Sequence, residues 1–131
     1  MDPMLVISQS DKRPIYLQIM EQIKRRIAVG DWAEGHPLPS IRQLAVDLQV
    51  SVITVKRAYL ELEREGVIIT QQGKGSRVTA TAGIGLKLQH EELQKHLEQV
   101  ARLSMLLGVK PRELESRLRE VSDNITAKEK S

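Results

Sequence analysis

The sequence has no cysteine and no phenylalanine, and it contains only one tryptophan and two tyrosines. Without cysteine the chain can form neither disulfides nor thiolate metal sites, and it has no thiol nucleophile. The few aromatic rings leave little for base stacking, the usual route to RNA and single strands. No apolar run is long enough for a signal peptide or a membrane span. We therefore expect a cytoplasmic protein with no membrane partner.

Charge gives only a weak indication of function. Lysine and arginine together number 20 and aspartate and glutamate 17, for a formal net charge of +3. Such a balance is compatible with nucleic-acid binding, but the positions of the charges matter more. His36, His90 and His96 lack metal-ligand spacing, and no serine–histidine–carboxylate set stands out. We expect no metal, no cofactor, no catalytic residues and no enzymatic activity.

Helical periodicity begins at Pro14. Isoleucines recur every four residues from Ile15 to Ile27, which predicts one apolar helix face with Gln18 mostly opposite it. Gly30 suits the end of this helix. The glycine and prolines of residues 31–39 predict a loop, from which Trp32 and Leu38 fold inward.

Two serines predict the starts of the next helices. Ser40 is followed three residues later by Gln43, a capping-box pattern, and Ile41, Leu44, Ala45 and Leu48 form the apolar face of that helix. Ser51 is the predicted cap of a third helix, which runs to Glu65.

The first turn of this third helix contains a conflict. SVITVKRAY, residues 51–59, is rich in β-branched residues, which favour strands. Yet Val52, Val55, Tyr59 and Leu62 recur at helical spacing through it. We predict a helix in which tertiary packing overrides local propensity.

After Gly66 the period changes to two. VIIT and SRVTA, joined by QQGKG, predict a β-hairpin, and residues 79–85 read as a flexible hinge. Beyond the hinge, heptad-like spacing predicts two short helices separated by Gly108 and Pro111, with a frayed tail over residues 126–131. The expected fold is mainly α with a small β-hairpin: an N-terminal winged helix-turn-helix (residues 1–80) followed by a two-helix dimerisation segment (residues 81–131). The dimerisation residues are Leu93, Leu97, Val100, Ser104, Leu107, Leu114, Leu118 and Val121.

A helix-turn-helix places the start of its second helix in the major groove of duplex DNA. Arginine and lysine can donate to guanine there, hydroxyls can bond bases or phosphates, and Val52 or Ile53 can contact a thymine methyl. Gly73 and Gly75 allow close backbone approach at the hairpin, where Lys74 supplies charge. The candidate DNA-binding residues are Ser40, Arg42, Ser51, Val52, Ile53, Thr54, Lys56, Arg57, Gly73 and Lys74.

These motifs carry a resemblance to a known family. The run LPSIRQLAVDLQVSVITVKRAYLELEREGVIITQQGKGSRV resembles the DNA-binding domain of GntR-family transcriptional regulators, and the helix from Pro14 is similar to the family's opening helix. The resemblance implies that Arg42, Ser51, Thr54, Lys56 and Gly73 contact DNA. Many members have arginine where this sequence has Val52, so their operators do not transfer to it. The C-terminal helix pair resembles the YtrA-like subfamily, in which such a pair serves dimerisation.

We therefore expect a sequence-specific repressor that binds an inverted-repeat operator in double-stranded DNA as a homodimer. The sequence leaves open an unidentified small-molecule effector. Two alternatives also stay open: a winged helix used as a protein–protein interaction module, and a nonspecific architectural DNA-binding protein. Salt-dependent binding favours DNA over the first alternative, and preference among duplex sequences excludes the second.

Overall fold

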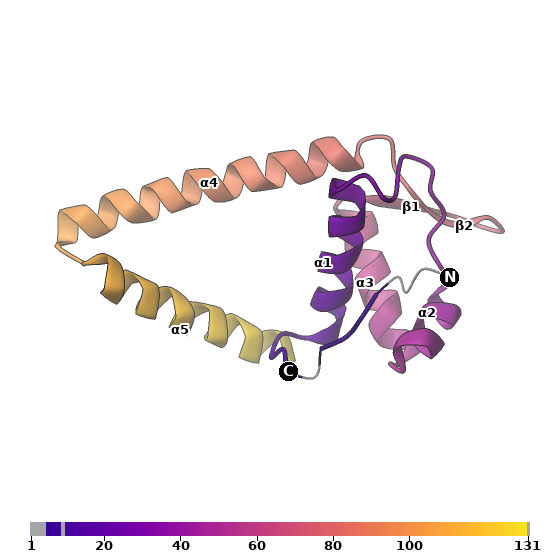
Figure 1. Cartoon of the computed structure of the whole chain (residues 1–131), viewed down its shortest axis with the longest axis horizontal. Coiled ribbons are helices and arrows are strands. Elements are labelled where there is room, and N and C mark those ends of the chain that lie inside the picture. Colours follow the sequence, from indigo (N-terminus) through magenta and orange to yellow (C-terminus); the bar gives the residue numbers. More distant parts are fainter. Residues whose placement is uncertain (1–4, 9, 131) are drawn as a thin grey trace. The chain divides into compact units, whose positions relative to one another are not determined.

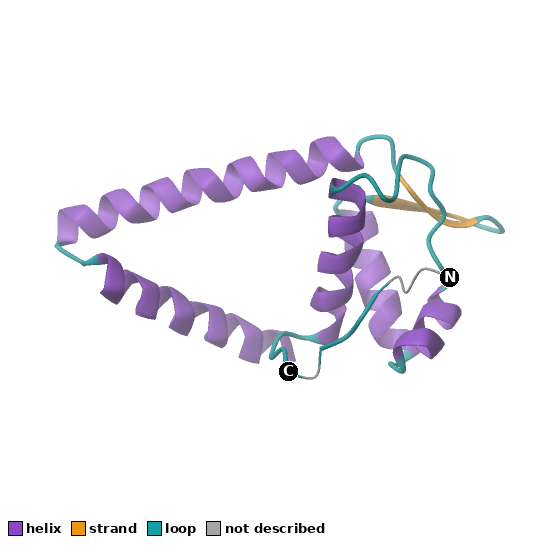
Figure 2. Cartoon of the chain, in the orientation of Figure 1, coloured by secondary structure: helices purple, strands orange, loops and turns teal. Residues whose placement is uncertain are grey.

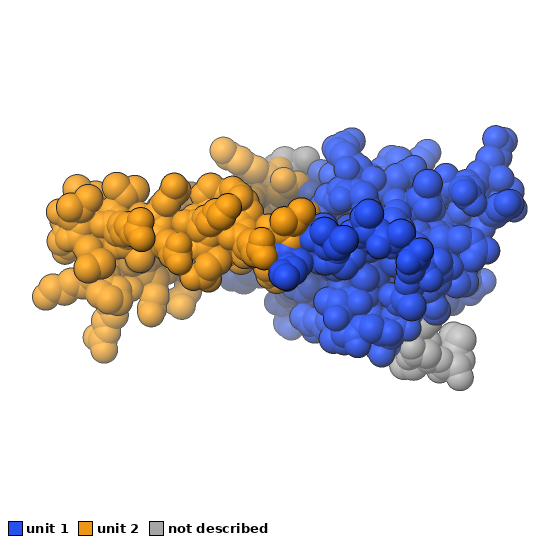
Figure 3. Space-filling model, turned by 90° about the horizontal axis from the view of Figure 1, so that it is seen from above, with its two compact units in different colours: residues 1–87 blue, residues 88–131 orange. Residues whose placement is uncertain are grey.

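The computed structural model describes residues 5–8 and 10–130. Figure 1 shows the elements in chain order: α1 (Ile15–Ala28), α2 (Ile41–Leu48), α3 (Val52–Arg64), β1 (Ile68–Gln71), β2 (Gly75–Val78), α4 (Ala82–Leu107) and α5 (Pro111–Lys130). The mainly helical character with one small hairpin is plain in Figure 2 and confirms the expected fold class. The chain divides into two compact units, residues 1–87 and 88–131 (Figure 3).

The core of the first unit is built on α1. Ile19, Ile23 and Ile27 are buried as the four-residue spacing predicts, whereas Ile15 lies at the margin. Gln18, which we expected on the solvent face, is buried instead. Its side-chain oxygen accepts the Ser8 N–H at 3.1 Å and its amide donates to the Arg13 carbonyl at 3.1 Å. The segment before α1 therefore packs over this part of the helix and shields Gln18, a polar residue, from solvent.

Helices α2 and α3 begin at the predicted serines. The Ser40 hydroxyl accepts the Gln43 N–H and the Ser51 hydroxyl accepts the Thr54 N–H, both at 3.1 Å. Of the capping box only the Ser40 half is formed: the Gln43 side chain bonds Asp47 through its amide instead of accepting the Ser40 N–H. Gln49, with φ of 57°, ends α2 in the left-handed conformation and turns the chain toward α3.

Helix α3 lies between α1 and α2 (Figure 1) and packs against both. Val55, Tyr59 and Leu62 are buried on it, but Val52, the first residue of the predicted apolar series, is exposed. The packing therefore holds α3 from its second turn onward and leaves its first turn outside the core.

The hairpin pairs β1 with β2 in antiparallel register, with Ile68 opposite Val78 and Gln71 opposite Gly75. A segment of the loop after α1 lies along the other edge of β2: Gly35 N–H donates to the Val78 carbonyl at 2.8 Å and Leu38 N–H to the Ser76 carbonyl at 2.9 Å. This pairing ties the hairpin to the residues that precede α2.

Three expectations for the C-terminal half were wrong. The predicted hinge is helical from Ala82, because Ala82 and Leu86 are buried in the core of the first unit. The two helices are not short, at 26 residues for α4 and 20 for α5. The tail is helical through Lys130 rather than frayed, and Ser131 lies outside the described residues.

The turn between α4 and α5 follows the prediction. Gly108 takes a φ of 73°, and the Val109 N–H returns to the Ser104 carbonyl at 2.8 Å. Such a left-handed glycine satisfies the last carbonyls of a helix. None of the helices in the described part of the chain has the length and apolarity needed to cross a membrane.

Candidate nucleic-acid interface

The first two turns of α3 present a mixed apolar and basic surface. Val52 is 46% exposed and Ile53 80% exposed, while Val55, between the outward positions, is fully buried. Lys56 and Arg57 lie three and four residues after Ile53 and are also exposed, so these three side chains share the outward face of the helix. The helix presents this face as a rigid unit because its opposite face is fixed in the core.

The hydroxyls at the start of α3 have partners within the protein. Ser51 caps the helix, and its Oγ lies 2.8 Å from the Thr54 Oγ1. A hydroxyl has one donor and two acceptor sites, so each retains capacity for at least one further bond. Their first role is structural: they hold the N-terminal turn in shape despite its β-branched residues.

Arg57 is held against α1. Its guanidinium lies 3.8 Å from the centre of the Tyr16 ring and donates to the Tyr16 hydroxyl at 3.3 Å. A cation over an aromatic face gains roughly 0.5–1 kcal/mol at an exposed site. Arg57 therefore joins α3 to α1, a role that the sequence pattern did not reveal because the two residues are 41 positions apart.

Ser40 and Arg42 are exposed at the start of α2. The preceding residue is fixed to α3, since the buried Tyr59 hydroxyl donates to the Pro39 carbonyl at 2.7 Å. Burial raises the pKa of this phenol, so it stays protonated and can act as the donor. This bond sets the position of the α2 N-terminus relative to α3. It therefore also sets the backbone position from which the Arg42 side chain extends.

Gly73 and Lys74 lie exposed at the tip of the hairpin, which extends beyond the helices of this unit in Figure 1. Gly73 has a φ of 81° and Gly75 a φ of 76°, a conformation that glycine adopts without strain. Arg77, which the sequence reasoning passed over, donates from its guanidinium to the Gly35 carbonyl at 3.1 Å. Arg77 thereby fastens the hairpin to the loop before α2.

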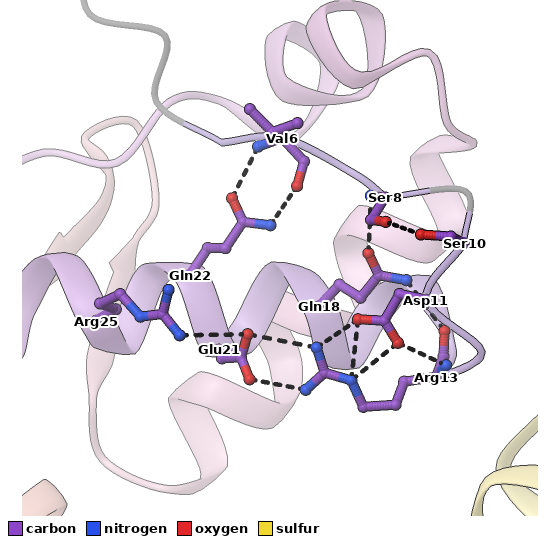
Figure 4. Close-up of polar contacts among 9 residues, drawn as sticks. All are labelled: Val6, Ser8, Ser10, Asp11, Arg13, Gln18, Glu21, Gln22 and Arg25. Carbon is purple, nitrogen blue, oxygen red and sulfur yellow. Dashed lines mark hydrogen bonds and ion pairs between the residues drawn. The ribbon is translucent and has the colours of Figure 1, made fainter.

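A polar cluster attaches the N-terminal segment to α1 (Figure 4). The Gln22 side chain exchanges two hydrogen bonds with the Val6 backbone, as a neighbouring strand would. Arg13 bonds Asp11 at 2.6 Å and Glu21 at 2.7 Å, and its guanidinium lowers the pKa of the Glu21 carboxyl. Because these charges pair with one another, we assign the cluster to anchoring the segment rather than to binding a ligand.

The predicted dimerisation residues are mostly exposed in the second unit. Leu97 and Val100 are each 44% exposed, and Leu93, Leu107, Leu118 and Val121 are more so. Leu114 is partly buried, and Ser104 is buried beside the turn at Gly108. From that turn α4 and α5 diverge (Figure 1), so they leave much of their apolar surface to solvent.

Comparisons with known proteins give the family. Residues 15–78 match the family described as bacterial regulatory proteins, gntR family. The HTH-type transcriptional repressor YtrA of Bacillus subtilis is 32% identical over 129 residues, which cover 98% of this chain and 99% of that protein.

Solved structures agree with this assignment. YtrA from Sulfolobus acidocaldarius, a GntR-family transcription factor, has a TM-score of 0.56 at 35% identity and covers 70% of this chain and 98% of its own. The AraR DNA-binding domain in complex with operator ORX1 has a TM-score of 0.51 at 26% identity and covers 56% of this chain and 94% of its own. The helices, caps and hairpin of residues 15–78 are therefore those of a GntR-type DNA-binding domain, and the chain belongs to the GntR family of bacterial transcriptional regulators.

Proposed function

We propose that this protein is a homodimeric repressor that reads an inverted-repeat operator through the N-terminal end of α3. The observation that carries the proposal is the exposed first turn of α3, in which the stiff side chains of Val52 and Ile53 stand beside Lys56 on a helix fixed in the core. Helix N-terminal residues reach base edges first in a major groove. The N–H groups and the positive dipole at that end also favour phosphate.

The proposed contacts fall into two groups. Arg42 and Lys56 read bases, because their donors suit the guanine O6 and N7 atoms in the major groove. Ser40, Ser51, Thr54 and Arg57 bond phosphate with the capacity that their internal bonds leave. Gly73 and Lys74 place the hairpin against the backbone or the minor groove. Acidic residues dominate the distal half of α3, so the contacts concentrate at its start.

The second unit supports the dimer proposal. Leu93, Leu97 and Val100 on α4 and Leu118 and Val121 on α5 expose aliphatic surface that one copy of the chain does not cover. Two copies that pair these faces would bury it, and each Å² removed from water contributes about 25 cal/mol. A two-fold dimer presents two equivalent α3 helices, which require symmetric half-sites. Repression follows from occupation of such an operator, and the full-length similarity to a protein named as a repressor supports it.

Selection of bound sequences from a random duplex pool tests specificity and symmetry together. We expect an inverted repeat whose half-sites lie about one helical turn apart, or a multiple of it. A selected pool without any preferred sequence would support a nonspecific architectural role. Absence of duplex binding at low salt would instead favour a protein–protein interaction module.

Three single substitutions test the division of contacts. Arg42→Ala or Lys56→Ala should cost about 1–3 kcal/mol in operator binding and relax base preference at one position. Lys74→Ala should weaken all duplexes evenly and lower the salt slope by about 1. Lys110→Ala, before α5, is the matched control and should change neither. Equal, sequence-independent losses at Arg42, Lys56 and Lys74 would contradict this division.

The dimer is tested at Leu97 and Val100. The double variant Leu97→Asp, Val100→Asp should sediment as a monomer and bind half-sites with the affinity of a single unit. Gln94→Asp, Gln99→Asp adds the same two charges to α4 away from the predicted seam and should remain a dimer. A variant at Leu97 and Val100 that stays dimeric at low concentration would refute the proposed interface.

A further inference from the structure

Two apolar side chains stand exposed at the start of α3, where the surrounding surface is polar. Ile53 is 80% exposed and Val52 46% exposed, and neither belongs to the core cluster. Their neighbours in the first turns are the capping hydroxyls of Ser51 and Thr54 and the amino group of Lys56. Most of the Ile53 side chain and nearly half of Val52 stay open to solvent, so burial does not account for the apolar character of this surface.

The chemistry of the major groove supplies one. Among the four bases only thymine presents a methyl group there, whereas the others present hydrogen-bond donors and acceptors. A β-branched side chain in a helix has essentially one χ1 rotamer, so it loses little entropy when it packs against a methyl. Ile53 is 80% exposed and lies one helical turn before Lys56 and Arg57, the side chains that the proposed function directs at DNA.

We infer that Ile53, with Val52 beside it, selects thymine in each half-site through the 5-methyl group. The inference rests on the proposed function, because it requires this end of α3 to enter the groove. The inference adds to the proposed function the kind of base that is read. One position of the half-site is selected as thymine by apolar contact, next to the guanines selected by Arg42 and Lys56. The half-site should therefore contain at least one thymine whose methyl group, rather than its hydrogen bonding, determines affinity.

A protein partner fits these residues less well. The apolar surface amounts to two side chains set among cations and hydroxyls, whereas a protein docking site needs a contiguous apolar centre. Leu60 is another exposed apolar residue on α3 and therefore a suitable control for Ile53. It is 51% exposed, two turns after Ile53 on the same face, and acidic Glu61 and Glu63 flank its turn.

The test uses the operator obtained by selection with the full-length protein. Each thymine of one half-site is replaced singly by deoxyuridine, which removes the methyl and keeps every hydrogen-bonding group. Losing one methyl contact should weaken binding about fourfold, by the usual value for one buried carbon. We expect this loss at one or two thymines, with the remaining thymines insensitive.

Variants then assign the methyl to its side chain. Ile53→Ser should bind the thymine operator about as weakly as the wild type binds the sensitive deoxyuridine operator, and should not distinguish the two DNAs. Ile53→Val, which keeps a branched apolar group, should keep part of the discrimination. Leu60→Ser is the matched control and should distinguish thymine from deoxyuridine as the wild type does. Because Ile53 is largely exposed, these changes should leave the circular dichroism spectrum and the melting temperature unchanged.

The outcomes separate the inference from the proposed function. Selective operator binding with every deoxyuridine tolerated would overturn the inference and leave the proposed function intact. An undiminished deoxyuridine effect in Ile53→Ser would overturn it as well, because another group would then read the methyl. A random pool that yields no preferred sequence would overturn both.

Discussion

The bond from the Tyr59 hydroxyl to the Pro39 carbonyl should be worth about 1–1.5 kcal/mol of folding free energy, which Tyr59→Phe measures. The bond is short, at 2.7 Å, and Tyr59 is buried on α3. A typical internal hydrogen bond contributes about 1 kcal/mol net, and a buried acceptor left without any hydrogen-bond partner costs roughly 1–3 kcal/mol. Pro39 is only partly buried, so water can replace the lost donor and the loss stays near the lower value.

Urea denaturation followed by circular dichroism measures this loss. Protomer concentration is held constant, since association would shift apparent stability by mass action. Tyr16→Phe is the matched control: it also removes a phenolic oxygen from a buried ring, but that oxygen accepts a longer bond, 3.3 Å, from the exposed Arg57. A loss in Tyr59→Phe no larger than that in Tyr16→Phe would refute the reasoning.

Alkaline pH provides an independent check on Tyr59. Burial raises its folded-state pKa, so the folded protein keeps the phenol protonated where the unfolded chain ionises it. The stability from this group is fully present below about pH 10, the ordinary phenol pKa, and is lost as pH rises toward the folded-state pKa. The difference between wild type and Tyr59→Phe should therefore shrink above pH 10. A constant difference across that range would show that the phenol is not protected as described.

Three further predictions concern the helices, the hairpin and the N-terminal cluster. Gly83→Ala should raise the free energy of unfolding by about 0.5–1 kcal/mol, because the position is helical and a Cβ there meets open space. Gly73→Ala should lower the free energy of unfolding by about 1 kcal/mol, because its φ of 81° strains any side chain even though the space is open. Glu21→Gln should lower stability near neutral pH by less than about 1 kcal/mol, since the ion pair with Arg13 is partly exposed. Arg13 lowers the folded-state pKa of Glu21, so that difference should be present above the ordinary glutamate pKa and vanish as pH falls through the lowered value.

The sequence predicted the first unit well because its signals are local. Ser40 and Ser51 cap the helices at which they were placed, and the buried faces of α1 and α3 follow the helical spacing. Such patterns need no knowledge of the rest of the chain, since a cap and an apolar stripe act within a few residues. The GKG turn was equally predictable from the sequence, because a positive φ at Gly73 restricts the residue type.

The errors came from long-range packing. Gln18 is buried because a segment ten residues earlier covers it, and the Ser8 N–H of that segment donates to the Gln18 side-chain oxygen. Glycines 83 and 85 suggested a hinge, but Ala82 and Leu86 pack into the core and hold the start of α4 helical. Propensity is a weak guide wherever such tertiary contacts exist. The Arg57–Tyr16 contact lay beyond sequence reasoning for the same reason.

The β-branched first turn of α3 shows how stability and recognition can be separated within one helix. Its second and later turns are held by Val55, Tyr59 and Leu62, and the Ser51 cap satisfies the N–H of Thr54. Together these fix the helix without help from the intrinsic preference of residues 52 and 53. Because Ile53 is 80% exposed and lies outside the core cluster, substitutions there should change what the helix presents while leaving its position intact. A fold of this kind can acquire new operators by exchanging one exposed turn. If stability and recognition are separated in this way, substitutions in that turn should change base preference without lowering the melting temperature.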